Sequence, residues 1–188
     1  MSKRPFILSI AGFDPSGGAG VIADAKTFEQ HNVQGLFVLT ANTIQTAVNF
    51  NSVNWVDDAL IIEQLHSILD HHPIKYVKIG LIRNIALLEK LVQLLIDKDL
   101  KIVWDPILIA SSGFKFHKEL LGLEKVLKKI HYITPNWLEI KALSGEEGVN
   151  GAKLLSSYTK VYLKGGHSQD LGKDYLVTKG NIIPFKIT

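Results

Sequence analysis

The sequence contains no cysteine among its 188 residues. This absence excludes disulfides, thiolate zinc sites and cysteine nucleophiles within the chain. Long hydrophobic runs are also missing. The apolar stretch after Pro5 soon meets Asp14 and Pro15, so it is too short and too interrupted for a membrane span or the core of a signal peptide. We therefore expect a cytoplasmic protein that makes no membrane contact.

A basic stripe with interleaved aromatic residues is missing as well, although the formal net charge is +3. The lysines are scattered, with only short clusters such as Lys128-Lys129. This distribution argues against a nucleic-acid partner. A slightly positive chain does suit the binding of nucleotide polyphosphates, which carry negative charge.

Several common catalytic motifs are absent. The glycines of residues 12–20 are not followed by the lysine of a phosphate-binding P-loop, and their spacing differs from the dinucleotide-binding fingerprint. The seven histidines show no convincing metal-ligand spacing, although His167 stands out because it follows two glycines. No Ser-His-Asp constellation stands out, so a hydrolase is poorly supported.

Short apolar runs typical of buried strands alternate with amphipathic stretches typical of helices. Strands are expected at residues 6–11, 35–41, 76–79, 102–104, 132–134 and 161–163, with a closing hairpin at 175–177 and 182–187. Helices are expected at about 21–31, after caps at 57–58 and 84, at 120–130, and from about 136. Alternation with continuously apolar strands predicts an α/β fold, in which helices cover both faces of a mostly parallel sheet. One domain over residues 1–188 is expected from the length.

The unusual polar and glycine residues follow the ends of the expected strands. In an open α/β sheet, ligands bind outside the carboxyl ends of the strands, so these residues are expected to gather at one edge. Their alignment with that edge is the strongest argument from the residues alone for an active site. The segments concerned are 12–20, 42–46, Gly80, Asp105-Pro106, 134–139 and 164–167.

Each of these segments also has a purely structural interpretation. A glycine-rich turn can simply allow tight packing and positive φ. Asn136 is a good helix N-cap, and Glu139 suits the partner position of a capping box, but a carboxylate there can also hold magnesium. Asp105 can start a turn. Lys164 can belong to a turn or reach a phosphate as a point charge.

Taken together, the motifs resemble the bacterial hydroxymethylpyrimidine and phosphomethylpyrimidine kinases of thiamine biosynthesis, which belong to the ribokinase-like superfamily. The resemblance runs through the chain in order, and its first segment is the longest and most specific. The matching segments are residues 10–20, Ala23-Asp24-x-Lys26-Thr27-Phe28, Thr40-Ala41 with Gln45, Lys78-Ile79-Gly80, Asp105-Pro106, Ile133-Thr134-Pro135-Asn136-x-x-Glu139 and Lys164-Gly165-Gly166-His167.

The resemblance implies a ribokinase-like fold and ATP-dependent phosphorylation of 4-amino-5-hydroxymethyl-2-methylpyrimidine and of its monophosphate. Gln45 offers both a donor and an acceptor, which suits the edge of an aminopyrimidine. The implied roles divide into a pyrimidine site at Gly12, Asp24, Gln45, Leu81 and Ile107, a Mg²⁺ site at Asp105 and Glu139, and an ATP site at Asn136, Lys164 and Gly166. The implied partners are the pyrimidine, ATP and a second copy of the chain in a homodimer.

Two further expectations concern the reaction. The resemblance places the catalytic base, the anion hole and the last helices beyond Thr188, so the 188 residues are expected to bind a pyrimidine more readily than they phosphorylate it. Two alternatives remain open: a pyridoxal-type kinase, because related folds phosphorylate hydroxymethyl groups on pyridine rings, and a pyrimidine-binding protein without kinase activity.

Overall fold

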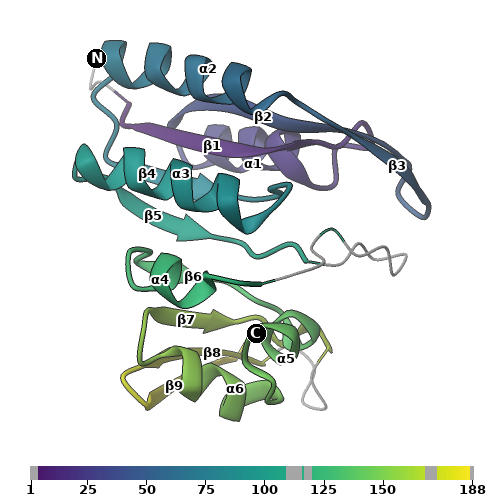
Figure 1. Ribbon diagram of the computed structural model, residues 1–188. Coiled ribbons are helices and arrows are strands. Elements are labelled where there is room, and N and C mark those ends of the chain that lie inside the picture. Colours follow the sequence, from purple (N-terminus) through teal and green to yellow (C-terminus); the bar gives the residue numbers. More distant parts are fainter. Residues whose placement is uncertain (1–3, 109–115, 117–119, 168–172, 187–188) are drawn as a thin grey trace.

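Nine strands form a single sheet in the computed structural model, which describes residues 4–108, 116, 120–167 and 173–186 (Figure 1). The strand order is β3-β2-β1-β4-β5-β6-β7-β8-β9. The strands are β1 Phe6–Phe13, β2 Gln34–Gln45, β3 Phe50–Trp55, β4 Tyr76–Ile79, β5 Lys101–Trp104, β6 Tyr132–Ile133, β7 Lys160–Leu163, β8 Lys173–Thr178 and β9 Asn181–Lys186.

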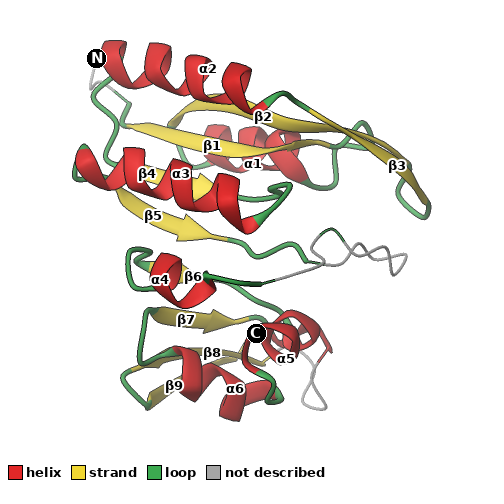
Figure 2. Cartoon of the chain, viewed as in Figure 1, coloured by secondary structure: helices red, strands yellow, loops and turns green. Residues whose placement is uncertain are grey.

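The helices lie on both faces of this sheet. Figure 2 shows α1 behind β1, while α2 and α3 lie in front. The helices are α1 Gly20–Gln30, α2 Asp58–His71, α3 Ile85–Asp97, α4 Leu123–Leu127, α5 Trp137–Ser144 and α6 Gly148–Leu155, and a short 3₁₀ turn, η1, covers Gly165–His167. The predicted α/β architecture with helices on both faces is therefore confirmed.

The centre of the sheet is parallel and its two edges are antiparallel. β2, β1, β4, β5, β6 and β7 pair in parallel, whereas β3, β8 and β9 join through antiparallel pairs. The central strands are continuously apolar because helices cover both of their faces. Leu8, Ile10, Ile79 and Ile102 are completely buried there. All parallel strands end at one edge, which is where the polar segments gather.

Local signals explain several element boundaries. The side chain of Asp57 caps α2 by accepting from the amide of Ala59, and Asn84 caps α3 by accepting from the amide of Leu87. One face of α3 is fully apolar and packs on the sheet. No helix among the described residues is long and apolar enough to cross a membrane.

Three expectations about the elements were wrong. Residues 42–45 continue β2 instead of forming a loop, and they pair with β3, which the sequence did not predict because its residues are mostly polar or exposed. Helix α6 was missed because Gly148 and Gly151 interrupt its helical pattern. Helix α4 is shorter than the predicted helix over 120–130, because Gly122 adopts a left-handed conformation with φ of 82° at its start.

Candidate active site

The loop after β1 is organised by the carboxylate of Asp14. Its Oδ1 accepts from the amide of Ser16 at 2.8 Å, and its Oδ2 accepts from the hydroxyl of Ser16 and the amide of Ala19, both at 2.9 Å. Burial alone would raise the pKa of Asp14, but hydrogen bonds from Gln45, Ser16 and Ala19 outweigh it and hold the pKa below its usual value. The carboxylate is therefore ionised at neutral pH.

Close backbone contact explains one glycine of this loop. Gly20 has φ of 59°, and a Cβ atom built there would lie 2.1 Å from the carbonyl oxygen of Gly12. A side chain at this position would push the loop away from β1, because the two backbones are already in contact. The same return of the chain appears as a bridge between Phe13 and Gly20. Tight packing thus accounts for Gly20 without any ligand.

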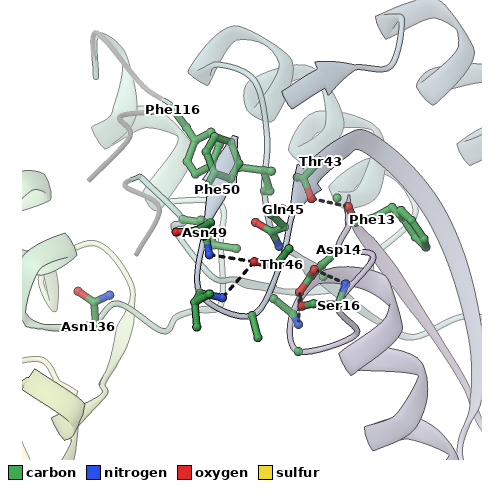
Figure 3. Close-up of a pocket in the computed structure, with 18 of the residues that line it drawn as sticks. Phe13, Asp14, Ser16, Thr43, Gln45, Thr46, Asn49, Phe50, Phe116 and Asn136 are labelled. Atoms are coloured by element: carbon green, nitrogen blue, oxygen red, sulfur yellow. Dashed lines mark hydrogen bonds between the residues drawn. The ribbon is translucent and has the colours of Figure 1, made fainter. Parts of the chain in front are cut away.

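A cavity of about 480 Å³ opens beside this loop at the carboxyl edge of the sheet (Figure 3). Its lining joins the loop after β1 and the β2–β3 hairpin with the start of α5. Of the predicted site residues, the structure brings six together in this lining: Gly12, Gln45, Leu81, Ile107, Asn136 and Glu139. The cavity is therefore continuous from the predicted pyrimidine side to the predicted nucleotide side.

Next to the cavity, three charged side chains meet at the ends of β5, β6 and β7. The Lys164 ammonium lies 2.7 Å from Oδ1 of Asp105 and 3.9 Å from Oε2 of Glu139. The hydroxyl of Thr134 donates to the same Asp105 oxygen at 3.1 Å. Lys164 thus lies within ion-pair distance of two carboxylates. The group of Asp105, Glu139 and Lys164 is called the charged cluster below.

The Glu139 carboxyl has a raised pKa. Burial raises it most and the neighbouring Asp105 also raises it, whereas the amide of Asn136 and the ammonium of Lys164 lower it, and the net result is a pKa of about 7. The amide of Asn136 donates to Oε2 of Glu139 at 2.8 Å, and the Asn136 side chain accepts from the amide of Glu139. This capping box confirms the structural interpretation of both residues.

The charged cluster suits a magnesium ion. Mg²⁺ keeps several waters and takes only one or two protein carboxylates beside the phosphates of a nucleotide. Asp105 and Glu139 supply two carboxylates near one cation, and no group of three or more candidate metal ligands occurs among the described residues. Two carboxylates are therefore a donor set that Mg²⁺ can use together with the phosphates of a ligand.

The turn after β7 is held by a residue that sequence analysis missed. Asp174 in β8 accepts from the amide of Gly165 and from the hydroxyl of Tyr162, both at 2.7 Å. The hydrogen bond to Asp174 raises the pKa of the Tyr162 phenol. Beside it, a Cβ atom built on Gly166 meets nothing within 4 Å among the described residues. Among the described residues, the backbone of this turn is therefore uncovered next to Lys164. Asp174 reaches the turn because β8 pairs with β7.

Asp24 is separated from the other predicted pyrimidine-site residues. It is not among the described residues that line the cavity. Its carboxylate instead accepts from Lys78 at 2.9 and 3.0 Å and from the hydroxyl of the fully buried Ser9. Its position on α1 turns the side chain towards β1 and β4, where this ion pair joins the helix to the sheet.

The β2–β3 hairpin adds lining residues that the sequence did not single out. It projects beyond the sheet in Figure 1 and contributes Asn49 and Phe50 to the cavity. The Phe50 ring meets Phe116 edge-on, with ring centroids 5.4 Å apart. Phe50 belongs to a short strand with little buried surface, so its hydrophobic pattern gave no strong signal for this contact.

Comparison with known proteins identifies the family. The sequence profile described as phosphomethylpyrimidine kinase matches residues 14–188. The chain belongs to this family. It is 39% identical over 182 residues to a hydroxymethylpyrimidine/phosphomethylpyrimidine kinase of Saccharomyces cerevisiae, a match that covers 88% of the chain and 33% of that protein. The enzyme of the same name from Aquifex aeolicus is 36% identical over 176 residues, covering 85% of the chain and 68% of that relative.

Solved structures agree with the family assignment. A phosphomethylpyrimidine kinase from Clostridium difficile superposes with a TM-score of 0.83 at 30% identity, covering 97% of this chain and 84% of that structure. An ADP complex of Bacillus subtilis pyridoxal kinase superposes with a TM-score of 0.81 at 27% identity, covering 98% and 75%. The predicted ribokinase-like fold and the predicted resemblance are both confirmed, while this chain spans one third of its yeast relative and about two thirds of the Aquifex one.

Proposed function

We propose that this member of the phosphomethylpyrimidine kinase family transfers the γ-phosphate of ATP to the hydroxymethyl oxygen of 4-amino-5-hydroxymethyl-2-methylpyrimidine, and then phosphorylates the resulting monophosphate. The observation that carries the proposal is the single cavity that joins Gly12 and Gln45 to Asn136 and Glu139. A phosphoryl transfer needs both substrates in one space, because the attacking oxygen must lie in line with the leaving ADP.

The pyrimidine would bind between Gln45 and the apolar side chains of Leu81 and Ile107. The amide of Gln45 can both donate to and accept from an aminopyrimidine edge. The hydroxyl of Thr40 donates to the carbonyl of Leu81 at 2.6 Å and so holds the apolar wall in place. A Cβ atom on Gly12 would lie 3.1 Å from the Leu81 side chain, so glycine leaves room for a ring to approach the backbone.

The nucleotide would bind at the charged cluster, with Asn136 and Gly166 beside it. Asp105 and Glu139 would hold Mg²⁺, which neutralises charge on the transferred phosphate. Lys164 would then exchange its ion pair with Asp105 for a phosphate oxygen, which its flexible stem allows. The bond between the γ-phosphorus and the bridging oxygen would break as the new bond to the hydroxymethyl oxygen forms. ADP would leave with the bridging oxygen, and the proton of the hydroxymethyl group would pass to solvent.

A pyridoxal-type kinase is the second candidate, because the fold superposes closely on the pyridoxal kinase of Bacillus subtilis. Both substrates carry a hydroxymethyl group on a ring, so the fold alone does not separate them. The edge of the ring distinguishes the two substrates. Only the aminopyrimidine has an exocyclic amino group beside a ring nitrogen, and Gln45 can pair with both.

Calorimetry with each ring compound in the presence of Mg²⁺ and a non-hydrolysable ATP analogue tests the choice. We expect tighter binding of the aminopyrimidine than of pyridoxal, and preference for pyridoxal would contradict the proposal. An ADP-release assay with ATP then separates a kinase from a protein that only binds. Binding without release of ADP would favour the pyrimidine-binding alternative.

We further propose that the chain forms a homodimer in the cytoplasm. Support comes from the β2–β3 hairpin, where the apolar side chains of Ile44 and Val48 are 52% and 84% exposed. Exposed apolar side chains that gather on a projecting element favour association with another surface. Light scattering on the purified chain tests this proposal. A monomeric mass across the working concentration range would contradict it.

A further inference from the structure

Asp174 belongs to no predicted site, yet its carboxylate contacts the turn that follows Lys164. Its Oδ1 accepts from the amide of Gly165, and its Oδ2 accepts from the hydroxyl of Tyr162, both at 2.7 Å. Because β8 pairs antiparallel with β7 up to Leu163, Asp174 lies beside the first residues after β7. One carboxylate therefore joins β8 to β7 and to the turn after it.

The chain is held closely on both sides of this hydrogen bond. The amide of Lys164 donates to the carbonyl of Pro135 at 2.9 Å. A Cβ atom built on Gly165 would overlap the carbonyl oxygen of Lys173, so the turn is in backbone contact with β8. The amide that Asp174 accepts from belongs to the peptide group between Lys164 and Gly165. Asp174 therefore fixes the direction in which the chain leaves Lys164.

The ammonium of Lys164 lies at the charged cluster, 2.7 Å from Oδ1 of Asp105 and 3.9 Å from Oε2 of Glu139. Asp174 is a nearby carboxylate, but both of its oxygens already accept hydrogen bonds from uncharged donors. A carboxylate that is occupied in this way competes less for a lysine. The arrangement around Asp174 thus orders the turn and leaves the ammonium to the charged cluster.

We propose that Asp174 is a positioning residue for nucleotide binding, which it supports by keeping Lys164 at the charged cluster; the inference rests on the proposed function. A lysine side chain is long and flexible, so its ammonium reaches a defined place more readily when its backbone is fixed. A turn that is ordered before the nucleotide arrives does not have to be ordered by binding, and this raises the affinity. Asp174 itself needs no contact with the nucleotide.

Calorimetry with the magnesium-bound ATP analogue tests the inference on the full chain. Asp174→Ala removes the acceptor of the Gly165 amide, and we expect the affinity for the analogue to fall about fivefold. The affinity for the aminopyrimidine should stay the same, because other segments form its proposed site. Urea unfolding establishes that the variant is folded under the conditions of the measurement. An unchanged affinity for the analogue in the folded variant would overturn the inference.

Asp174→Asn is the rescue variant. Its side-chain oxygen can still accept from the amide of Gly165, and its NH₂ group can donate to the oxygen of Tyr162. We therefore expect it to bind the analogue within about twofold of the wild-type protein. A loss as large as that in Asp174→Ala would show that the negative charge matters and the position of the turn does not, which would overturn the inference.

Ser156→Ala is the matched control. The hydroxyl of Ser156 accepts from the amide of Gly180 at 3.0 Å, so it too holds a glycine in a turn next to β8, but at the opposite end of that strand. The affinity for the analogue should not change in this variant. A loss equal to that in Asp174→Ala would show that any loosening of β8 lowers the affinity, and the inference would be overturned.

A double-mutant cycle with Lys164→Met tests whether Asp174 acts through the lysine. Once Lys164 has been replaced, Asp174→Ala should lower the affinity for the analogue no further, because the group that it positions is gone. Two independent effects would instead multiply in the double variant, and that result would overturn the inference.

A measurement on the wild-type protein does not depend on the folding of any variant. The amide hydrogen of Gly165 should exchange slowly with water before any nucleotide is added, because Asp174 accepts it. Fast exchange in the free protein would overturn the inference. If the wild-type protein binds the analogue, each of these contrary results overturns the inference alone, whereas no binding of the analogue at all would overturn the proposed function with it.

Discussion

Asp14 and Glu139 stand on opposite sides of the same cavity, each only 4% exposed, yet their pKa values move in opposite directions. The amides of Ser16 and Ala19 and the Ser16 hydroxyl all donate to Asp14. Within the described part of the chain, Glu139 accepts a hydrogen bond from only one backbone amide, that of Asn136, and the Lys164 ammonium lies 3.9 Å from its Oε2. Burial raises the pKa of both carboxyl groups, but at Asp14 the hydrogen-bond donors outweigh burial, whereas at Glu139 they do not.

The two sides of the cavity differ accordingly in how they are held. The proposed pyrimidine side is shaped by backbone contacts and by a carboxylate that stays ionised. The proposed nucleotide side is a cluster of charges that a bound ion and phosphates would rearrange. The first arrangement suits a rigid ring that must be recognised by its edge, and the second suits a ligand that brings its own charge.

Gly20→Ala should cause the largest loss of stability, because it disrupts the contact between the loop after β1 and the backbone of Gly12. The new Cβ would lie 2.1 Å from the carbonyl oxygen of Gly12 at a φ of 59°. We expect a loss of about 3 kcal/mol or more in the free energy of unfolding, measured with urea. Gly122→Ala is the control, since its φ is 82° but no atom of the described residues lies within 4 Å of the new Cβ. It should lose only about 1–2 kcal/mol. Equal losses would show that the contact with Gly12 is unimportant.

Glu139→Gln should remove a pH dependence from the free energy of unfolding. The pKa of about 7 in the folded chain exceeds the ordinary glutamate value of 4.5, so the native chain holds this proton more tightly than the unfolded chain. The contribution of Glu139 to stability is therefore fully present below pH 4.5 and is lost as the pH rises through 7, by up to about 3 kcal/mol. The glutamine variant should lack this fall in urea unfolding at pH 4.5 and 7.5. A difference between variant and wild type that does not change with pH would contradict the shift.

Gln45→Ala tests whether the two sides of the cavity bind different ligands. Removing the amide should weaken pyrimidine binding by about 1–3 kcal/mol, because the ring would lose its hydrogen-bonding partner. Binding of the magnesium-bound ATP analogue should change little, since Gln45 lies on the other side of the cavity from the charged cluster. Calorimetry with each ligand alone measures both affinities. An unchanged affinity for the pyrimidine would remove Gln45 from the proposed site.

Lys164→Met should have the smallest of these effects. The direction of the change in nucleotide affinity tests whether Lys164 leaves Asp105 to bind a phosphate. Loss of the ammonium should weaken binding of the magnesium-bound ATP analogue about tenfold, or roughly 1.4 kcal/mol, while pyrimidine binding stays the same. Lys98→Met, which breaks an exposed ion pair with Asp70, is the control and should change neither affinity. Tighter nucleotide binding in Lys164→Met would show that the lysine only competes with the ion.

Much of the fold could be predicted because its signals are local or periodic. Continuous apolar runs predicted the central parallel strands, Asn84 and Asp57 predicted two helix starts, and the turn at Lys179-Gly180 predicted the β8–β9 hairpin. The capping box of Asn136 and Glu139 also follows from their spacing alone.

Contacts between distant segments were harder to predict. The strand β3 makes a projecting hairpin and has little apolar surface to bury, so it left no clear periodic pattern. The pairing of Asp24 with Lys78 depends on how α1 packs on β4, which no local signal contains. For the same reason the sequence did not reveal that Asp174 accepts from the amide of Gly165.

The raised pKa of Glu139 couples ion binding at the charged cluster to the release of a proton. With a pKa of about 7, this carboxyl is about half protonated at neutral pH. A cation that binds there must displace that proton, so each binding event would release about half a proton into the buffer near pH 7. The measured heat of binding would then depend on the ionisation enthalpy of the buffer, and the affinity for the ion would rise with pH until Glu139 is fully ionised.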